Sequence, residues 1–192
     1  YNTQDSIIWM AEGRKYEEVV LMTASLARLL RQSISNEDEV VPLAREVEYA
    51  KGYLTIQKMR YKDKLEFEID VEPSILNIPL IKLVLQPIIE NAIYHGLKYK
   101  ESKGLLQVKG FMKDGNAVLQ VIDNGVGMDE ETLSHIYDKH KVNYHSNGVG
   151  VYNVQKRLKL YYGENYGITY ESEKGVGTTA TITIPGIQEE SI

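Results

Sequence analysis

The segment that decides the fold is Asp123-Asn124-Gly125-Val126-Gly127, which closes an expected strand over residues 117–122. Its two glycines permit a tight turn with positive φ and the close approach of a flat ligand. Three other short segments accompany it in order along the chain: Glu90, Asn91 and His95 before it, then Asn147-Gly148-Val149-Gly150, then Gly175-Val176-Gly177-Thr178. Each segment alone is weak evidence, so its meaning depends on the rest of the chain.

The composition is that of a globular protein with one well-buried domain and a smaller helical part. The chain has 192 residues, of which 26% are charged, and a net charge of -5. The sequence lacks a large basic block, which argues against non-specific nucleic-acid binding. It also lacks cysteine, which excludes disulfides, thiol catalysis and zinc–cysteine sites. No apolar run approaches the ~20 residues that span a bilayer and no signal peptide is visible, so we expect a cytoplasmic domain.

The first 61 residues carry helical periodicity. The apolar cluster after Tyr1 has no N-cap before it, which predicts a helix that starts further upstream. Apolar residues recur at helical spacing over 16–34 and 43–61, with a turn at 35–39 between them. This pattern predicts a helical hairpin that packs against a second copy as a four-helix bundle. The alternative is that these helices pack on the neighbouring domain.

The remaining chain has the pattern of a sheet covered by helices. We expect strands near 65–71, 105–111, 117–122, 168–172 and 178–184 and a helix over 151–162. A further helix is expected to begin at Pro79 and end near Gly96, with Pro87 as a local violation inside it. These elements predict an α/β (α+β) two-layer sandwich with helices on one face of a mixed, mostly antiparallel sheet. We divide the chain into a helical segment 1–61, a domain 62–187 and a tail 188–192.

Asn91 and His95 are four residues apart, so they share one face of their helix. An Asn side-chain oxygen is a neutral hard ligand suited to Mg²⁺, which takes its other ligands from water and phosphates. His95 could donate a hydrogen bond to a phosphate oxygen. The alternative is that both are polar residues on a solvated face, and the pair alone favours that alternative.

The glycine segments allow a similar pair of interpretations. A carboxylate at Asp123 can accept a hydrogen bond from an exocyclic amine, which adenine offers. Gly148 and Gly150 precede a helix, so backbone N–H groups there can face phosphates. Gly177 and Thr178 precede a strand, and Thr178 offers a hydroxyl beside the expected purine site. The alternative in each case is an ordinary turn or helix start.

Other known ligand motifs are absent from the sequence. No segment has the spacing of a P-loop, and no glycine pair has the third glycine of a dinucleotide fingerprint. His135, His140 and His145 are evenly spaced, but five-residue spacing does not align side chains on one helix face. We therefore predict a mobile, solvated segment over 130–147 rather than a metal site.

The four segments together resemble the ordered N, G1, G2 and G3 boxes of the ATP-binding fold shared by gyrase, Hsp90, histidine kinases and MutL. The segment 85–96, including its unusual Pro87, is similar to the N box of LytS-like sensor histidine kinases, and 148–158 resembles their G2 box and following helix. Tyr1-Asn2-Thr3 resembles the end of their acceptor motif, whose histidine would lie three residues upstream. Gln4 departs from the leucine that is usual there.

This resemblance implies a histidine kinase that binds ATP with Mg²⁺ and phosphorylates the upstream histidine. It implies that Asn91 holds the metal, that Asp123, Gly125, Gly127, Gly177 and Thr178 surround the nucleotide base, and that Gly148 and Gly150 let a lid close on the phosphates. Glu90 would orient the metal shell or act as a base. The implied partners are a response-regulator receiver domain and a second copy of the chain, in a parent protein anchored in the cell membrane. The rivals are an ATPase of the gyrase or Hsp90 type and a catalytically silent dimerisation module.

Overall fold

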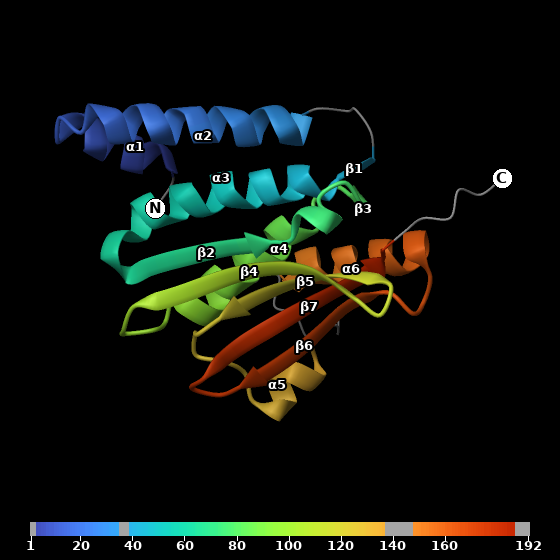
Figure 1. Cartoon of the computed structure of the whole chain (residues 1–192). Coiled ribbons are helices and arrows are strands. Elements are labelled where there is room, and N and C mark those ends of the chain that lie inside the picture. The colour runs from blue at the N-terminus through green and yellow to red at the C-terminus, as the bar shows by residue number, and fades with distance from the viewer. Residues whose placement is uncertain (1–2, 35–38, 137–147, 187–192) are drawn as a thin grey trace.

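A computed structural model describes residues 3–34, 39–136 and 148–186 of the chain. Its centre is a five-stranded sheet with the strand order β2-β4-β5-β7-β6 (Figure 1). β2 and β4 are parallel and the other neighbours are antiparallel, which confirms the predicted mixed sheet. Their bounds are β2 Leu65–Val71, β4 Gly104–Lys113, β5 Asn116–Asp123, β6 Gly167–Glu173 and β7 Gly177–Pro185.

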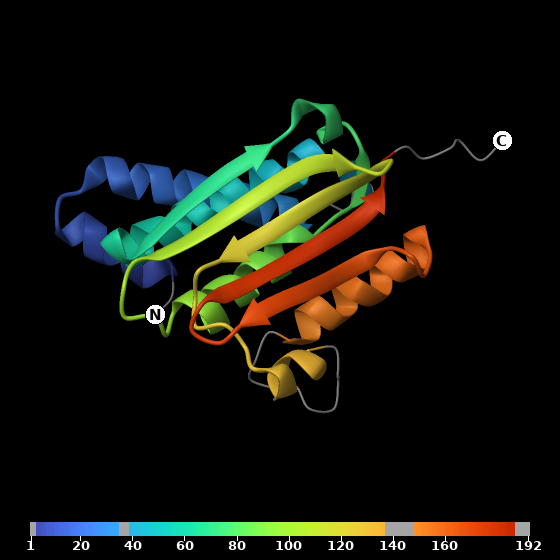
Figure 2. The same cartoon turned by 60° about the horizontal axis from the view of Figure 1, so that its bottom comes forward.

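Helices cover one face of this sheet, as predicted. Figure 2 shows α3, α4 and α6 behind the five strands, with α1 and α2 beyond α3. The helices are α1 Thr3–Glu12, α2 Tyr16–Ile34, α3 Leu43–Tyr61, α4 Leu85–Asn91, α5 Glu130–Ser134 and α6 Gly148–Tyr162. Single turns of 3₁₀ helix, η1 (Lys62–Lys64) and η2 (Pro73–Ile75), flank β2, and a π-helical segment η3 (Ala92–Leu97) continues α4.

The expectation that a helix begins at Pro79 is wrong. Residues Pro79–Ile81 form the short strand β3, which pairs antiparallel with β1 (Val40–Pro42), and the helix begins only at Leu85. Pro87 is therefore the third residue of α4 rather than an interior one. In the first turn a backbone N–H has no intrahelical partner, so proline removes no helix hydrogen bond there. Pro87 is consequently no local violation.

The predicted helical hairpin divides between two apolar clusters. Leu43, Ala50 and Leu54 of α3 are buried in the large core together with α4, α6 and the inner face of the sheet. Met10 of α1 and Met22 of α2 pack with Ile56 of α3 in a separate, smaller cluster. α3 thus lies on the sheet domain, as the alternative interpretation had it, whereas α1 and α2 pack mainly on α3, and Trp9 of α1 also contacts Lys62 of η1 through a cation–π interaction at 4.1 Å. The domain boundary near residue 62 stays a prediction.

Candidate nucleotide site

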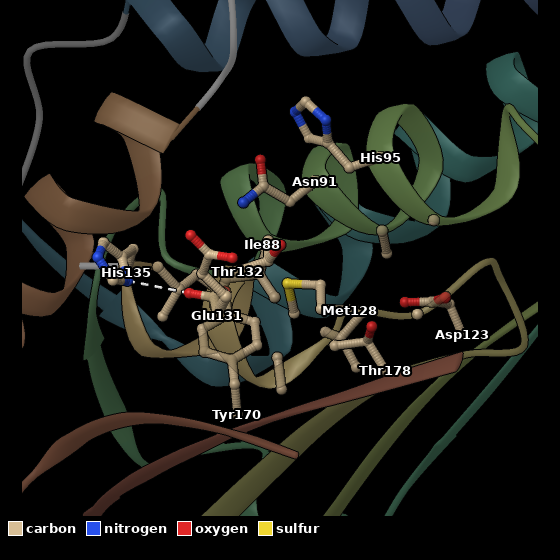
Figure 3. Close-up of a pocket in the computed structure, with 16 residues that line it drawn as sticks. Ile88, Asn91, His95, Asp123, Met128, Glu131, Thr132, His135, Tyr170 and Thr178 are labelled. Carbon is tan, nitrogen blue, oxygen red and sulfur yellow. Dashed lines mark hydrogen bonds between the residues drawn. The ribbon is translucent and has the colours of Figure 1, made fainter. Parts of the chain in front are cut away.

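A cavity of about 540 Å³ lies between the sheet and the layer formed by α4 and η3. Its wall brings together Asn91, His95, Asp123, Gly127 and Thr178, which come from α4, η3, β5, the loop after β5 and β7 (Figure 3). A volume of this size is typical of a small-molecule site. The structure therefore gathers residues from three of the four sequence segments around one space.

Much of the cavity wall is apolar. Ile88 and Ala92 line it from the helix, and Val121 and Ala180 line it from the sheet. Met128, Ile136 and Tyr170 complete these surfaces. Apolar walls with a few convergent polar groups suit a flat, mostly apolar ring system whose edge carries hydrogen-bonding groups.

Asp123 is the buried carboxylate of this cavity. It is 6% exposed, and its Oδ1 accepts a hydrogen bond from Gly125 N at 2.8 Å. Burial raises the pKa of Asp123 to about 6, although the N–H groups of Gly125 and Thr178 and the charge of Lys100 act in the opposite direction. Once ionised, this carboxylate can accept a further hydrogen bond from an exocyclic amine.

Three glycines allow the loops around Asp123 to lock together. The α-carbon of Gly125 packs on the carbonyl of Gly96, and Val126 N donates to that same carbonyl at 3.1 Å. Gly127 (φ 64°) and Gly177 (φ 146°) have conformations that favour glycine, and a β-carbon at either would collide with a backbone carbonyl oxygen. These positions are therefore closed to other residues for steric reasons, independent of any ligand.

Ser172 of β6 supports two residues of the cavity wall, Met128 and Thr178, and sequence reasoning missed it. Its hydroxyl accepts a hydrogen bond from Met128 N at 2.8 Å and donates one to Gly177 O at 2.9 Å. The hydroxyl oxygen of Thr178 lies 2.9 Å from the hydroxyl oxygen of Ser172. Ser172 thus joins the loop after β5 to the turn before β7. Nothing in the sequence distinguishes it from any other polar residue of a strand.

Asn91 and His95 project from the same side of one helix, as predicted (Figure 3). The side-chain oxygen of Asn91 is buried and accepts no hydrogen bond within the part of the chain that the structure describes. His95 is more exposed. Partial burial and the nearby charge of Lys98 lower the pKa of His95, which favours the neutral imidazole. A buried acceptor without a donor is costly unless a ligand satisfies it.

The Asn91 oxygen fits the first ligand of a hard cation. Within the described ranges, no group of three or more His, Cys, Asp or Glu side chains could hold a metal ion. A cation at Asn91 would therefore take its remaining ligands from water and from a bound phosphate, which is how Mg²⁺ is commonly held with nucleotides.

Glu90 does not line the cavity. Its carboxylate accepts a hydrogen bond from Gln86 Nε2 at 2.9 Å and lies close enough to Tyr53 of α3 to raise the pKa of that phenol, although burial is the larger cause. Glu90 therefore lies outside the cavity that Asn91 and Asp123 line. Its suggested roles, to orient the metal shell or to act as a base, stay predictions.

The second glycine pair starts α6, three residues earlier than expected. The helix begins at Gly148, and the α-carbon of Gly150 faces Pro87, where a β-carbon would lie 3.3 Å from the proline ring. Gly150 does not line the cavity, but it lets the start of α6 pack closely on α4. The predicted role of both glycines at the phosphates remains untested.

The short helix α5 borders the cavity and was not predicted. Glu131 and Thr132 of this helix and His135 directly after it line the cavity, and Asp129 caps the helix by accepting a hydrogen bond from Thr132 N at 3.0 Å. The Asp-x-x-Thr spacing is a recognisable start signal that could have indicated this helix. His140, His145 and most of the predicted mobile segment lie outside the described residues.

Comparison with known proteins decides the family. Residues 77–188 match the family described as histidine kinase-, DNA gyrase B- and HSP90-like ATPase, and residues 1–65 match a histidine kinase family. The chain belongs to the histidine kinase-like ATPases. This confirms the resemblance found in the sequence segments.

Relatives of this chain include sensor proteins. The chain is 33% identical over 185 residues to the sensor histidine kinase YesM of Bacillus subtilis, covering 96% of the chain and 31% of YesM. It is 34% identical over 143 residues to the sensor protein LytS of Oceanobacillus iheyensis, covering 73% of the chain and 24% of LytS. The chain thus spans a third or less of the length of these relatives. Among the helices of the described residues, none has the length and apolarity to cross a membrane.

Solved histidine kinases share the fold of this chain. The catalytic domain of ThkA aligns with a TM-score of 0.60 at 16% identity, over 78% of this chain and 99% of that domain. The histidine kinase domain of the blue-light activated kinase EL346 from Erythrobacter litoralis aligns with a TM-score of 0.56 at 14% identity, over 96% of this chain and 75% of that domain. These alignments confirm the fold class.

Proposed function

We propose that this chain is the catalytic part of a sensor histidine kinase, which binds Mg-ATP and transfers the γ-phosphoryl group to a histidine upstream of Tyr1. The observation that carries the proposal is the cavity in which Asp123 and Asn91 meet. One offers a carboxylate to an exocyclic amine, and the other offers a buried oxygen that lacks a donor among the described residues. These two groups match the two ends of an adenine nucleotide with its metal.

Each residue has a separate task in this proposal. Asp123 holds the adenine amine, and the apolar walls between the sheet and α4 exclude water from the ring. Asn91 would hold Mg²⁺, which when bound neutralises phosphate charge. His95 donates a hydrogen bond to a phosphate oxygen, and the N–H groups at the start of α6 face the phosphates. Phosphoryl transfer depends mainly on such positioning and charge neutralisation, so the fragment needs no covalent nucleophile of its own.

The proposed partners follow from the family. The phosphorylated histidine would pass its phosphoryl group to an aspartate of a response-regulator receiver domain. A second copy of the chain would pack on α1 and α2, where Trp9 is 53% and Val20 is 69% exposed. A second copy packed on these helices would bury large apolar side chains that are now exposed. The parent protein would be anchored in the cell membrane, with this part on the cytoplasmic side.

The test uses two proteins and ATP labelled at the γ-phosphate. The first is this chain, and the second is a version extended upstream through the acceptor histidine and carrying Asn91→Ala. We expect label on the extended protein that is lost in acid and stable in base, as is typical of phosphohistidine. A matched reaction in which both proteins carry Asn91→Ala should give no label.

The alternatives predict other outcomes. An ATPase of the gyrase or Hsp90 type would release labelled phosphate to water without labelling either protein. In that class a glutamate four residues before the metal-binding asparagine activates water, and this position is Pro87 here. A silent dimerisation module would give neither label nor turnover. If transfer occurs only within one polypeptide, the extended protein with Asn91 intact becomes labelled on its own, which still supports the kinase.

A further inference from the structure

The start of α4 is held by a buried carboxylate from another helix. Glu46 of α3 is 2% exposed, and its two oxygens accept hydrogen bonds from Leu83 N at 2.7 Å, Val84 N at 2.9 Å and Leu85 N at 3.0 Å. The first N–H groups of a helix have no intrahelical partner, and here they are remote from water because Val84 and Leu85 are fully buried. Glu46 supplies the acceptors that these groups need.

Pro87 also lowers the number of N–H groups without a partner at the start of α4. It is the third residue of α4 and has no N–H, so one more buried donor is removed from the start of the helix. The unusual proline and the distant glutamate thus act together, because each reduces the number of unsatisfied donors at the start of the helix. An isolated sequence segment shows only the proline.

The segment held by Glu46 is strained. Leu83 has a φ of 61°, a left-handed conformation that is costly for a bulky residue and persists only where surrounding contacts impose it. Its N–H is one of the three donors to Glu46, and the preceding carbonyl of Lys82 accepts a hydrogen bond from Arg157 Nη2 of α6 at 2.9 Å. The segment is therefore clamped from α3 on one side and from α6 on the other.

The attachment between α3 and this region is reciprocal. The first two N–H groups of α3 donate hydrogen bonds to the segment before β3, from Leu43 N to Ile78 O at 2.9 Å and from Ala44 N to Leu76 O at 2.8 Å. α3 and α4 lie side by side behind the sheet (Figure 2). A movement of α3 must therefore carry the start of α4 with it.

We infer that Glu46 is a positioning residue for the nucleotide site, which fixes α4, and with it Asn91, to α3. Asn91 lies six residues after Leu85, or ~9 Å along the helix axis. The same helix presents Ile88 to the cavity wall. α3 in turn packs on α2 in the smaller apolar cluster, so Glu46 connects the helical segment to the site. This inference rests on the proposed nucleotide site.

The test compares three variants of the whole chain. Glu46→Gln keeps the shape but places an amide N–H₂ among N–H donors. Glu48→Gln makes the same chemical change two residues away on the surface of α3. Leu54→Ala destabilises α3 through the core without touching the three hydrogen bonds that Glu46 accepts, which we call the Glu46 cap. Binding of MgADP is measured by calorimetry at a temperature where circular dichroism shows each variant folded.

Glu46→Gln should weaken MgADP binding by about tenfold or more, since hydrogen bonds to a charged acceptor are lost. Glu48→Gln and Leu54→Ala should keep the parental affinity within about twofold. Amide exchange of residues 83–85, measured without nucleotide, should accelerate in Glu46→Gln more than in Leu54→Ala. Parental affinity in Glu46→Gln, or an equal loss in Leu54→Ala, overturns the inference.

Two further outcomes remain decisive. If the unaltered chain does not bind MgADP, the proposed nucleotide site fails, while the exchange of residues 83–85 still tests the cap by itself. If Glu46→Gln does not fold, Leu83→Gly is added, because glycine adopts positive φ without support from Glu46. The double variant should regain its fold and still bind MgADP about tenfold more weakly than the unaltered chain. Full affinity in the double variant would show that the cap has no positioning role.

Discussion

The α-carbon of Gly96 packs directly against the carboxylate of Asp123, so that a β-carbon at Gly96 would lie 2.6 Å from Oδ1 and 3.0 Å from Cγ. Gly96 belongs to η3, the π-helical segment that continues α4, whereas Asp123 ends β5. The contact therefore joins the helical layer to the sheet at the adenine end of the proposed site. It makes the position of Asp123 sensitive to a single methyl group.

Gly96→Ala should push the Asp123 carboxylate out of its position. Because the carboxylate is buried, it has no equivalent position from which to bind the amine, and MgADP binding should weaken by about tenfold or more. Overpacking of this kind also costs about 1–3 kcal/mol of stability. Gly52→Ala is the matched control, since the interior of α3 has free space around Gly52. It should raise stability by about 0.5–1 kcal/mol and leave affinity unchanged. Thermal unfolding and MgADP titration measure both effects, and unchanged affinity in Gly96→Ala would contradict the steric argument.

Asp123→Asn should separate stability from binding. Burial raises the pKa of Asp123 from 3.8 to about 6, so the folded state binds more protons than the unfolded state between these values. The contribution of Asp123 to stability is thus fully present below pH 3.8 and is lost as the pH rises through 6. At pH 7.5 the asparagine variant should be more stable by about 1–3 kcal/mol, because it buries no charge and can still accept from Gly125 N. Urea unfolding at pH 4.5 and 7.5 tests this, and a destabilised variant at pH 7.5 would refute it.

Nucleotide affinity should depend on the protonation of Asp123. An exocyclic amine donates only to a carboxyl oxygen that is free to accept, so binding favours the ionised carboxylate and lowers its pKa. The affinity for MgADP should be constant above pH 7 and fall by up to about tenfold per pH unit below pH 6. Calorimetry between pH 5 and 8 measures this dependence. Asp123→Asn serves as the control, and an identical pH profile in that variant would assign the effect to another group.

Asn91→Ala should affect metal-dependent binding far more than folding. The Asn91 side-chain oxygen accepts no hydrogen bond within the described residues, so its removal costs the fold little and could add up to about 1 kcal/mol of stability. The difference in ADP affinity with and without Mg²⁺ should disappear in the variant. Titrations in MgCl₂ and in EDTA give the comparison. An unchanged Mg²⁺ dependence would show that the metal is held elsewhere.

The exposed apolar face of α1 and α2 should mediate self-association. Val20→Glu places a charge at a side chain that is 69% exposed, so the isolated chain should remain folded while a dimer dissociates. Leu160→Glu on α6 is the control, because Leu160 is 84% exposed outside this face. Sedimentation equilibrium should show weaker association by about tenfold or more for Val20→Glu alone. Equal association of the two variants would exclude this face as the interface.

Much of the fold could be predicted because its determinants are local. Alternating residues over 65–71 indicate a strand with one buried face, and the structure has β2 there. The segment Lys113-Asp114-Gly115-Asn116 predicts a hairpin turn, and Asp114 and Gly115 both have positive φ between β4 and β5. The spacing of Asn91 and His95 likewise places both on one side of a helix. In each case the deciding interactions lie within a few residues of one another.

Tertiary structure decided the features whose partners are distant in sequence. α4 starts at Leu85 rather than Pro79 because its buried N–H groups find their acceptor in Glu46, 39 residues from Leu85. Ser172 supports the cavity wall because folding brings it to Met128, 44 residues away. The raised pKa of Asp123 arises from burial beneath Gly96, which no local pattern contains. The sequence determined which segments form elements and which residues could meet a nucleotide, whereas the satisfaction of buried polar groups decided where α4 begins and how the site is held.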